Sequence, residues 1–186
     1  MPRSQEHSVE VTIRNRMGFH VRPVQRFAQL ARFFKADVQV RLKDRAVPGA
    51  SVINLVSLGG RCGDTMKIAA RGEDARQCIG VLRFLAENRF FVEDNLDGSE
   101  QPDRHIERLT RMASCFKSEI KVTLDGRSAD AKRPAEVAAL GLTPTSAAEF
   151  QINGEDAEQA RAVLDNLVAS CFYVEDRMAE RQRKAT

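Results

Sequence analysis

The alternation of apolar and polar residues predicts where the strands of this chain lie. Val9, Val11 and Ile13 alternate with polar neighbours, which is typical of a strand with one buried face. Farther along, apolar residues recur at helical spacing from Val24 to Phe34. The same two periods, followed through the first half of the chain, predict strand 8–14, helix 21–34, strand 37–43, strand 45–48, short helix 51–57, strand 65–70 and helix 73–90.

The chain also repeats itself at a constant offset of 82 residues. The repeated segments are Phe34-Lys35 with Phe116-Lys117, Gly72–Ala75 with Gly154–Ala157, and Phe90–Asp94 with Phe172–Asp176. A register that holds without a gap over some seventy residues indicates a duplication. The second copy then predicts helix 103–116, strand 119–124, strand 127–131, short helix 134–139, strand 147–152 and helix 155–178.

The second copy lacks the first strand. Residues 95–102 show no alternation and read as a polar linker, so we predict one domain at 1–94 and a shortened one at 103–186. Asp125-Gly126 is a strong signal for a two-residue hairpin between two strands of the second copy. One apolar face per strand implies antiparallel sheets covered by helices on one side, which is an α+β fold.

Composition narrows the classes of function. No apolar run is long enough to span a bilayer, and the polar N-terminus lacks a signal-peptide core, so we expect a cytoplasmic protein without membrane insertion. A net charge of +3 without a basic stripe argues against binding of nucleic acid. Four cysteines show no metal-type spacing and read as reduced thiols: Cys62, Cys78, Cys115 and Cys171. The sequence has neither paired carboxylates nor a nucleotide-binding glycine loop, the features that would indicate an enzyme. We expect no cofactor and no metal.

The segment Gly18-Phe19-His20-Val21-Arg22-Pro23 carries the candidate chemistry. His20 lies where the first strand gives way to a helix, with Pro23 in the first turn, beside free backbone N–H groups that bind anions. Arg22 adds a guanidinium that can hold phosphate oxygens. The segment indicates a histidine that accepts and returns a phosphoryl group, and the alternative is a solvated residue at a helix start.

The first copy resembles the histidine-containing phosphocarrier protein family, HPr, of the bacterial sugar phosphotransferase system. The resemblance covers roughly residues 8–94. It rests on Gly18–Pro23, Gly49–Leu55, Ser57-Leu58-Gly59, Gly63-Asp64-Thr65 and Phe91–Asp94. The family fold is an open-faced sandwich of four antiparallel strands with three helices on one face. The second copy would be a truncated form of it.

This resemblance implies roles for individual residues. His20 matches the phosphoryl acceptor through its Nδ1, and Arg22 matches its partner arginine, with Gly18 and Pro23 in support. The donor would be enzyme I, charged by phosphoenolpyruvate, and the acceptor an enzyme II A component. Ser51 matches the serine phosphorylated by a dedicated HPr kinase/phosphorylase, and its alternative role is a helix N-cap.

Apolar residues near the site offer a surface for partner proteins. Phe19, Val52, Leu55 and Val56 are the expected docking residues, with core packing as the alternative. A second class of function also stays open: a regulatory or adaptor protein built from HPr-like domains, controlled at His20 and Ser51 and without a role in sugar transport.

The second copy has lost both phosphorylation sites. Pro102 stands in place of His20 and Arg133 in place of Ser51, while His105 reads as a surface residue rather than a second acceptor. In the family sheet the first strand lies beside the fourth, so its loss would expose the edge of strand 147–152. We expect this edge to pair with the other copy, with a second molecule in a homodimer, or with a partner's strand.

Overall fold

The structure is a computed structural model that describes residues 6–91, 104–143 and 146–169. The chain divides into two compact units, residues 1–99 and 100–186. The predicted domain ends at residues 94 and 103, and the linker 95–102, lie at or outside the limits of the described residues. They therefore stay predictions.

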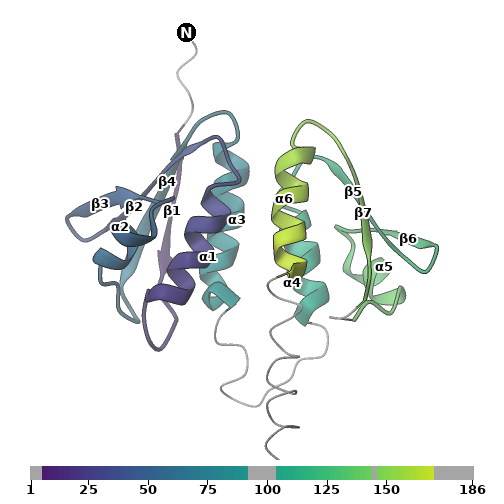
Figure 1. Cartoon of the computed structure of the whole chain (residues 1–186), viewed down its shortest axis with the longest axis horizontal. Coiled ribbons are helices and arrows are strands. Elements are labelled where there is room, and N and C mark those ends of the chain that lie inside the picture. Colours follow the sequence, from purple (N-terminus) through teal and green to yellow (C-terminus); the bar gives the residue numbers. More distant parts are fainter. Residues whose placement is uncertain (1–5, 92–103, 144–145, 170–186) are drawn as a thin grey trace, which may run out of the picture. The chain divides into compact units, whose positions relative to one another are not determined.

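The first unit is a four-stranded antiparallel sheet in the order β1-β4-β2-β3 (Figure 1). Its described elements are β1 (Glu6–Thr12), α1 (Val21–Ala31), β2 (Asp37–Leu42), β3 (Arg45–Pro48), α2 (Val52–Ser57), β4 (Thr65–Arg71), α3 (Ala75–Glu87) and a 3-10 turn at Arg89–Phe91. The pairing register places Ile68 of β4 between Val9 of β1 and Val40 of β2. The apolar residues that alternate in the sequence therefore share one face of the sheet.

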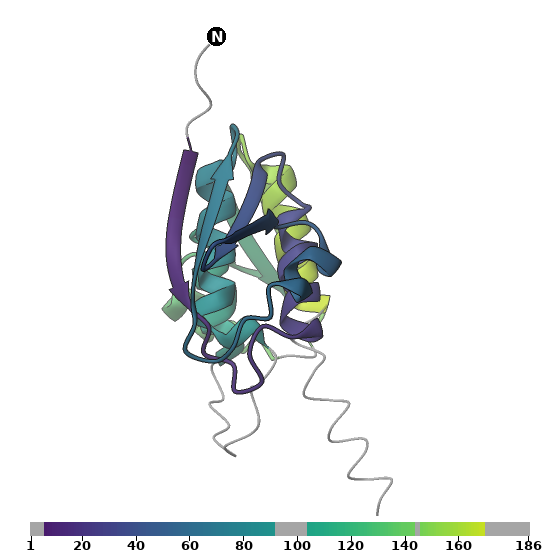
Figure 2. The same cartoon turned by 90° about the vertical axis from the view of Figure 1, so that its left-hand side faces the viewer.

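Helices cover that face and leave the other open. In Figure 1, α1 and α3 lie on the same side of the first sheet, and α2 packs against α1 beside β3. Figure 2 looks at this sheet from its uncovered side, with α3 behind β1 and β4. Phe27 of α1 and Leu82 of α3 are fully buried. The predicted open-faced α+β sandwich is confirmed.

Helix ends differ from the sequence prediction. Helix α1 ends at Ala31 rather than at 34, because the N–H groups of Phe33 and Phe34 bond to carbonyls only three residues back. The strand predicted at 8–14 is β1 at 6–12. It ends because the pairing slips by one residue at Ile13, whose N–H donates to the Asp64 carbonyl (2.9 Å) while its own carbonyl accepts the N–H of Gly63 (2.9 Å).

The last helix of the first unit also ends early, and the prediction that it reaches residue 90 is wrong. Helix α3 ends at Glu87, and the backbone then turns left-handed at three consecutive residues. The φ angles of Arg89, Phe90 and Phe91 are +53°, +57° and +53°. This region costs a residue with a Cβ about 1–2 kcal/mol, so surrounding contacts hold the turn in place.

The second unit keeps the architecture but has a three-stranded sheet in the order β6-β5-β7. Its described elements are α4 (Arg104–Ala113), β5 (Glu119–Leu124), β6 (Arg127–Asp130), α5 (Pro134–Ala139), β7 (Glu149–Asn153) and α6 (Ala157–Leu167). The hairpin at Asp125-Gly126 has φ values of +51° and +76°, as its sequence predicts. Within the described residues this unit is the shortened copy that the sequence predicts, and the predicted part of the last helix beyond residue 169 lies outside them.

A buried aspartate supports the same corner in both units. The Asp74 carboxylate accepts the backbone N–H groups of Lys35 and Ala36 at 2.7 and 2.8 Å, where the chain leaves α1 for β2. Asp156 accepts the N–H groups of Lys117 and Ser118 at 2.7 and 2.9 Å in the second unit. Charge-assisted bonds of this kind explain why the Gly-Glu-Asp-Ala segment recurs in the duplication.

The edge of β7 is partly covered by its own unit. The Ile120 carbonyl accepts the N–H of Ala131 on the β6 side of β5. The backbone N–H and carbonyl of Val122, two residues on, therefore point toward β6 as well. Phe150 stands opposite Val122, and its carbonyl therefore points to the free edge. There it accepts a hydrogen bond from Arg161 of α6 at 2.9 Å. In the first unit the matching positions are Ile68, which faces β1, and Ile79.

We predict that Arg161→Ile strengthens self-association of the chain. The substitution restores the residue of the first copy and frees a carbonyl on an open edge, which favours pairing with a second β7. Losing a charge-assisted bond worth about 1.5 kcal/mol corresponds to roughly tenfold tighter dimerisation. Sedimentation velocity over a concentration series measures it.

The control for this experiment is Asp165→Ile, which adds the same side chain at another exposed position of α6. If both variants stay monomeric over the whole series, the predicted homodimer through the 147–152 edge is wrong.

Candidate functional site

His20 lies at the N-cap of α1, as the sequence predicts. Its backbone is extended (φ −89°, ψ −172°), its side chain makes no capping bond, and its carbonyl accepts the first helical N–H from Val24 at 3.0 Å. The N–H groups of Val21 and Arg22 in the first turn have no helical acceptor, and Pro23 has none to offer. The half-buried His20 therefore lies at the positive end of a helix, next to N–H groups that have no acceptor within the helix.

The loop before His20 requires glycine. Gly18 has a φ of +74°, and its N–H bonds to the Asn15 carbonyl at 2.8 Å to close a tight turn. A Cβ at Gly18 would lie only 2.4 Å from the carbonyl oxygen of Gly60. That oxygen is itself needed, because it accepts the N–H of Phe19 at 2.8 Å. The backbone thus fixes the approach of the chain to His20.

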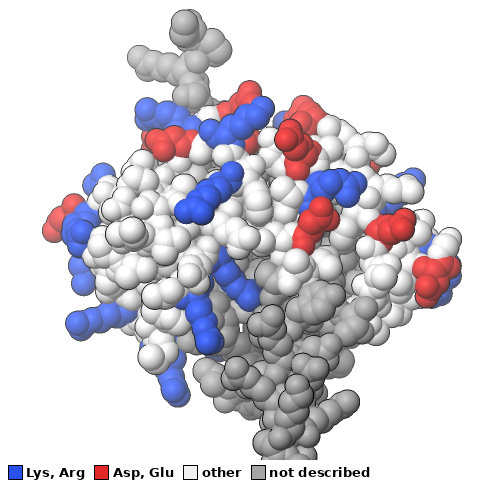
Figure 3. Space-filling model, in the orientation of Figure 1, with Lys and Arg blue, Asp and Glu red and all other residues white. Residues whose placement is uncertain are grey.

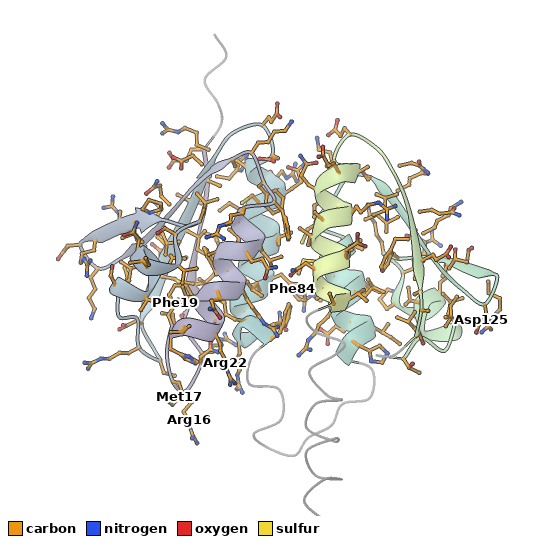
Figure 4. The ribbon with its side chains drawn as sticks, in the orientation of Figure 1. Arg16, Met17, Phe19, Arg22, Phe84 and Asp125 are labelled. Carbon is orange, nitrogen blue, oxygen red and sulfur yellow. The ribbon has the colours of Figure 1, made fainter. Side chains whose placement is uncertain are left out.

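Two of the expected docking residues belong to the core. Phe19 is 2% exposed and packs edge-on against Phe27, with ring centroids 5.8 Å apart. Leu55 is fully buried. The expectation that these two residues form a docking surface is therefore wrong, and the core-packing alternative holds for both. Figure 4 shows Phe19 directed into the first unit, while Met17 projects from the loop below α1.

Other apolar side chains, in the loop before His20, on α1 and on α2, are exposed. Ile53 is 82% exposed and Met17 70%, and Val21 and Val56 are exposed as well, while Val52 is half-buried. Sequence reasoning missed Met17, Val21 and Ile53. The helical period does contain a signal for Ile53, because a residue two positions from buried Leu55 lies on the opposite side of α2.

Exposed arginines lie on the same unit as these apolar side chains. Arg16 and Arg22 lie at the same end of the unit as Met17 (Figure 4), and both are exposed. Arg61 is exposed in the loop that packs against Gly18. Figure 3 shows basic side chains and no acidic ones on the lower part of the first unit. We call Met17, Val21, Ile53 and Val56, with Arg16, Arg22 and Arg61, the basic-apolar face.

Ser51 is the N-cap of α2. Its hydroxyl accepts the N–H of Asn54 at 3.5 Å, and the side chain is half-buried. In the second unit the matching residue, Arg133, forms ion pairs with Asp130 and Glu136 at 3.6 and 3.0 Å. The capping role that the sequence offered for Ser51 is therefore present, and phosphorylation of this serine stays a prediction.

The corresponding end of the second unit has different chemistry. His105, in the first turn of α4, places its Nε2 2.7 Å from the Leu142 carbonyl. Because a carbonyl only accepts, this nitrogen carries the proton and holds α4 to the loop after α5. Ala135 and Ala138 stand where the first unit has Ile53 and Val56. Pro102, which matches His20, lies outside the described residues.

The cysteines fit the expectation of free thiols. Cys78 is buried, and burial raises the pKa of its thiol; burial also raises the pKa of the Cys115 thiol to about 11. Cys62 is exposed, and Cys171 lies outside the described residues. Among the described residues no cluster of histidine, cysteine and carboxylate could hold a metal ion. Within the same ranges, no helix combines the length and the apolar character that crossing a membrane requires.

The sequence profile of the family described as "PTS HPr component phosphorylation site" matches residues 7–88 and 102–170, which is most of the chain. The chain belongs to the HPr family. Both matched regions carry an HPr-like unit, so the predicted tandem of HPr-like units is confirmed. His20 lies in the first matched region, inside the loop-to-helix junction described above.

Two curated relatives are much longer than the segment that they share with this chain. It is 38% identical over 94 residues to the multiphosphoryl transfer protein of Xanthomonas campestris, matching 50% of this chain and 10% of that protein. It is 33% identical over 86 residues to DhaM, the phosphoryl donor subunit of the PEP-dependent dihydroxyacetone kinase of Escherichia coli, matching 46% and 18%. The chain thus spans a small part of these larger relatives.

A smaller relative is covered almost completely. The phosphocarrier protein HPr of Haloferax volcanii is 34% identical over 74 residues, which are 39% of this chain and 83% of that protein. Among solved structures, HPr-C-His from Thermoanaerobacter tengcongensis is 32% identical, with a TM-score of 0.44, covering 45% of this chain and 94% of that one.

Proposed function

We propose that this protein is a phosphocarrier whose His20 accepts a phosphoryl group and passes it on. The observation that carries the proposal is His20 at the N-cap of α1, next to backbone N–H groups without a helical acceptor and to the exposed Arg22. An arriving phosphate brings about two negative charges, which the helix start and the guanidinium favour. The family match over residues 7–88 and the names of the relatives support the same role.

The proposed step exchanges one bond for another. A lone pair on an imidazole nitrogen of His20, Nδ1 by family resemblance, attacks phosphorus while the bond from phosphorus to the donor's side chain breaks. The N–H groups of Val21 and Arg22 and the Arg22 guanidinium hold the phosphoryl oxygens, so the protein contributes position and charge. Attack by the acceptor reverses the sequence and returns His20 unchanged. The protein is then a co-substrate of phosphotransferases rather than an enzyme.

Donor and acceptor are assigned at the level of class. The donor is an enzyme I charged by phosphoenolpyruvate. The acceptor is an enzyme II A component, or a related domain such as those that accompany HPr-like segments in larger proteins. The relatives named multiphosphoryl transfer protein and DhaM, of which this chain spans 10% and 18%, support a choice beyond a single sugar transporter.

The basic-apolar face suits partners with an acidic rim around an apolar centre. Ile53 and Met17 are large exposed apolar side chains, and residues of this kind lose most water on docking. The arginines around them favour encounter with an acidic surface and orient the partner over His20.

We predict that Ile53→Glu impairs docking and leaves the chemistry intact. A carboxylate in the apolar centre of the contact is expected to raise the KM for this protein in the enzyme I reaction by about tenfold to a hundredfold. The kcat should change less than twofold, because His20 is unaltered. Steady-state phosphorylation by enzyme I measures both values.

Ala135→Glu, at the matching position of the second unit, is the control and should leave KM unchanged. An unchanged KM for Ile53→Glu as well would exclude the basic-apolar face as the docking surface.

A second function is supported by the state of the second copy. That unit keeps its buried core, including Leu109, Phe116 and Leu164, while Arg133 replaces the serine and the docking side chains are reduced to alanines. A second unit that keeps its packing without phosphoryl chemistry suits a regulatory or adaptor protein. In such a protein, phosphorylation at His20 would control a binding partner, and so would phosphorylation at Ser51 by an HPr kinase/phosphorylase. Transfer of phosphate from His20 to an enzyme II A component distinguishes the two functions.

The direct experiment is phosphorylation of the full chain with labelled phosphoenolpyruvate and enzyme I. The proposal expects one phosphate per chain, labile in acid and stable in base, that maps to His20. Label that is absent, or that maps to another residue, contradicts the carrier function.

A further inference from the structure

A buried amide holds the His20 loop to the end of α3. Asn15 is fully buried, and its Nδ2 donates to the Arg89 carbonyl at 2.9 Å. The acceptor is a carbonyl, which fixes the orientation of the amide, and its Oδ1 then has no partner among the described residues. A buried oxygen left unpaired costs about 1–3 kcal/mol, so packing alone does not explain an asparagine here.

The partner of Asn15 is the left-handed turn at Arg89–Phe91. Phe90 is fully buried, and its ring lies 5.2 Å from that of Phe19, the residue before His20. Arg26, on α1, donates to the Phe90 carbonyl at 3.5 Å. A turn of three residues at positive φ persists only where such contacts determine it. The turn therefore contacts both the loop before His20 and the helix after it.

The opposite side of the loop is held by a different segment. The backbone N–H of Ile13 donates to the Asp64 carbonyl at 2.9 Å, and that of Phe19 donates to the Gly60 carbonyl at 2.8 Å. The loop from Ile13 to Phe19 is thus fixed on one side by residues 60–64 and on the other by the left-handed turn. His20 follows directly, so its ring depends on both attachments for its place at the helix start.

We infer that Asn15, acting through the left-handed turn at Arg89–Phe91, is a positioning residue for phosphoryl transfer at His20. The inference rests on the proposed carrier function and names a further residue on which that site depends. Asn15 itself touches no phosphoryl group in this scheme. It keeps the imidazole where an in-line donor reaches it, and transfer rates depend steeply on such placement.

The test compares Asn15→Ala with the wild-type chain in phosphorylation by enzyme I. The kcat is expected to fall by about tenfold to a hundredfold with KM within threefold, because the basic-apolar face is kept. NMR signals of the His20 ring should shift in the unphosphorylated variant. Adding Arg89→Gly should restore at least part of kcat, since glycine adopts the left-handed turn without the Cβ cost and needs less support.

Asp74→Asn is the matched control for lost stability. Its carboxylate acts at the other end of α1, about 16 Å from His20 along an eleven-residue helix. It should lower the urea midpoint, with kcat unchanged. If Asn15→Ala fails to fold, Phe90→Leu takes its place, because it loosens the contact with Phe19 without leaving a polar group unpaired, and it should lower kcat severalfold.

The carrier function and the positioning role of Asn15 are contradicted by different results. A wild-type chain that takes no label at His20 overturns the carrier function itself. A labelled wild type together with a folded Asn15→Ala, or Phe90→Leu, of full kcat and unshifted His20 signals overturns the positioning role alone. A fall in kcat that Asp74→Asn reproduces at equal loss of stability also overturns it.

Discussion

Replacing His20 with alanine is expected to abolish acid-labile phosphorylation of the chain by enzyme I and phosphoenolpyruvate. The imidazole is the only nucleophile in the proposed step, and a methyl group cannot form the P–N bond. The expected loss exceeds about a thousandfold in rate, the range seen when a covalent nucleophile is removed. Stability should change little, because the half-buried ring makes no capping bond.

His105→Ala is the control for this prediction. It removes the other histidine near a helix start and breaks the bond to the Leu142 carbonyl, yet it should leave labelling of His20 at full stoichiometry. Full labelling of His20→Ala, with the phosphate mapped elsewhere, would falsify the assignment of the acceptor.

The second large effect is expected for Gly18→Ala, which should lower the free energy of unfolding of the first unit by about 3 kcal/mol or more. A Cβ at φ +74° costs about 1–2 kcal/mol by itself. The remainder comes from the 2.4 Å approach to the Gly60 carbonyl, which cannot move away without losing its bond to Phe19. Urea unfolding followed by circular dichroism measures the loss, and phosphorylation of His20 should fall with it.

Gly59→Ala separates the two contributions. Gly59 has a similar φ of +63° but open space around its Cβ position, so its substitution should cost only about 1 kcal/mol. Equal costs for the two variants would mean that the contact with Gly60 does not constrain the loop.

Much of the fold could be predicted from the sequence because it follows local periods. Strand β5 and helix α5 lie where their sequence patterns place them, at Glu119–Leu124 and Pro134–Ala139, and the offset of 82 residues carries each inference from one copy to the other. The left-handed turn after α3 could not be predicted. Arg89-Phe90-Phe91 contains no glycine or asparagine, and the contacts that hold it come from the first loop of the chain.

The site was predictable in position and less so in its surroundings. A strand period, a glycine and a helix period place His20 at a helix start without any tertiary information. Whether a neighbouring apolar residue faces inward depends on distant partners, and Phe19 is buried by Phe27 and Phe90. Asn15 gave no signal at all, since a polar residue in a loop is ordinarily solvated and its acceptor lies far along the chain.

The Arg161 side chain makes the loss of the first strand hard to undo. Its guanidinium occupies the Phe150 carbonyl that a returning strand would need as its own acceptor. A graft of residues 6–12 ahead of the second unit would therefore gain little until Arg161 also changed. Reverting Arg161 first would leave an open edge prone to association. Each reversal is unfavourable without the other, so the shortened copy is held in its present form by epistasis between two sites.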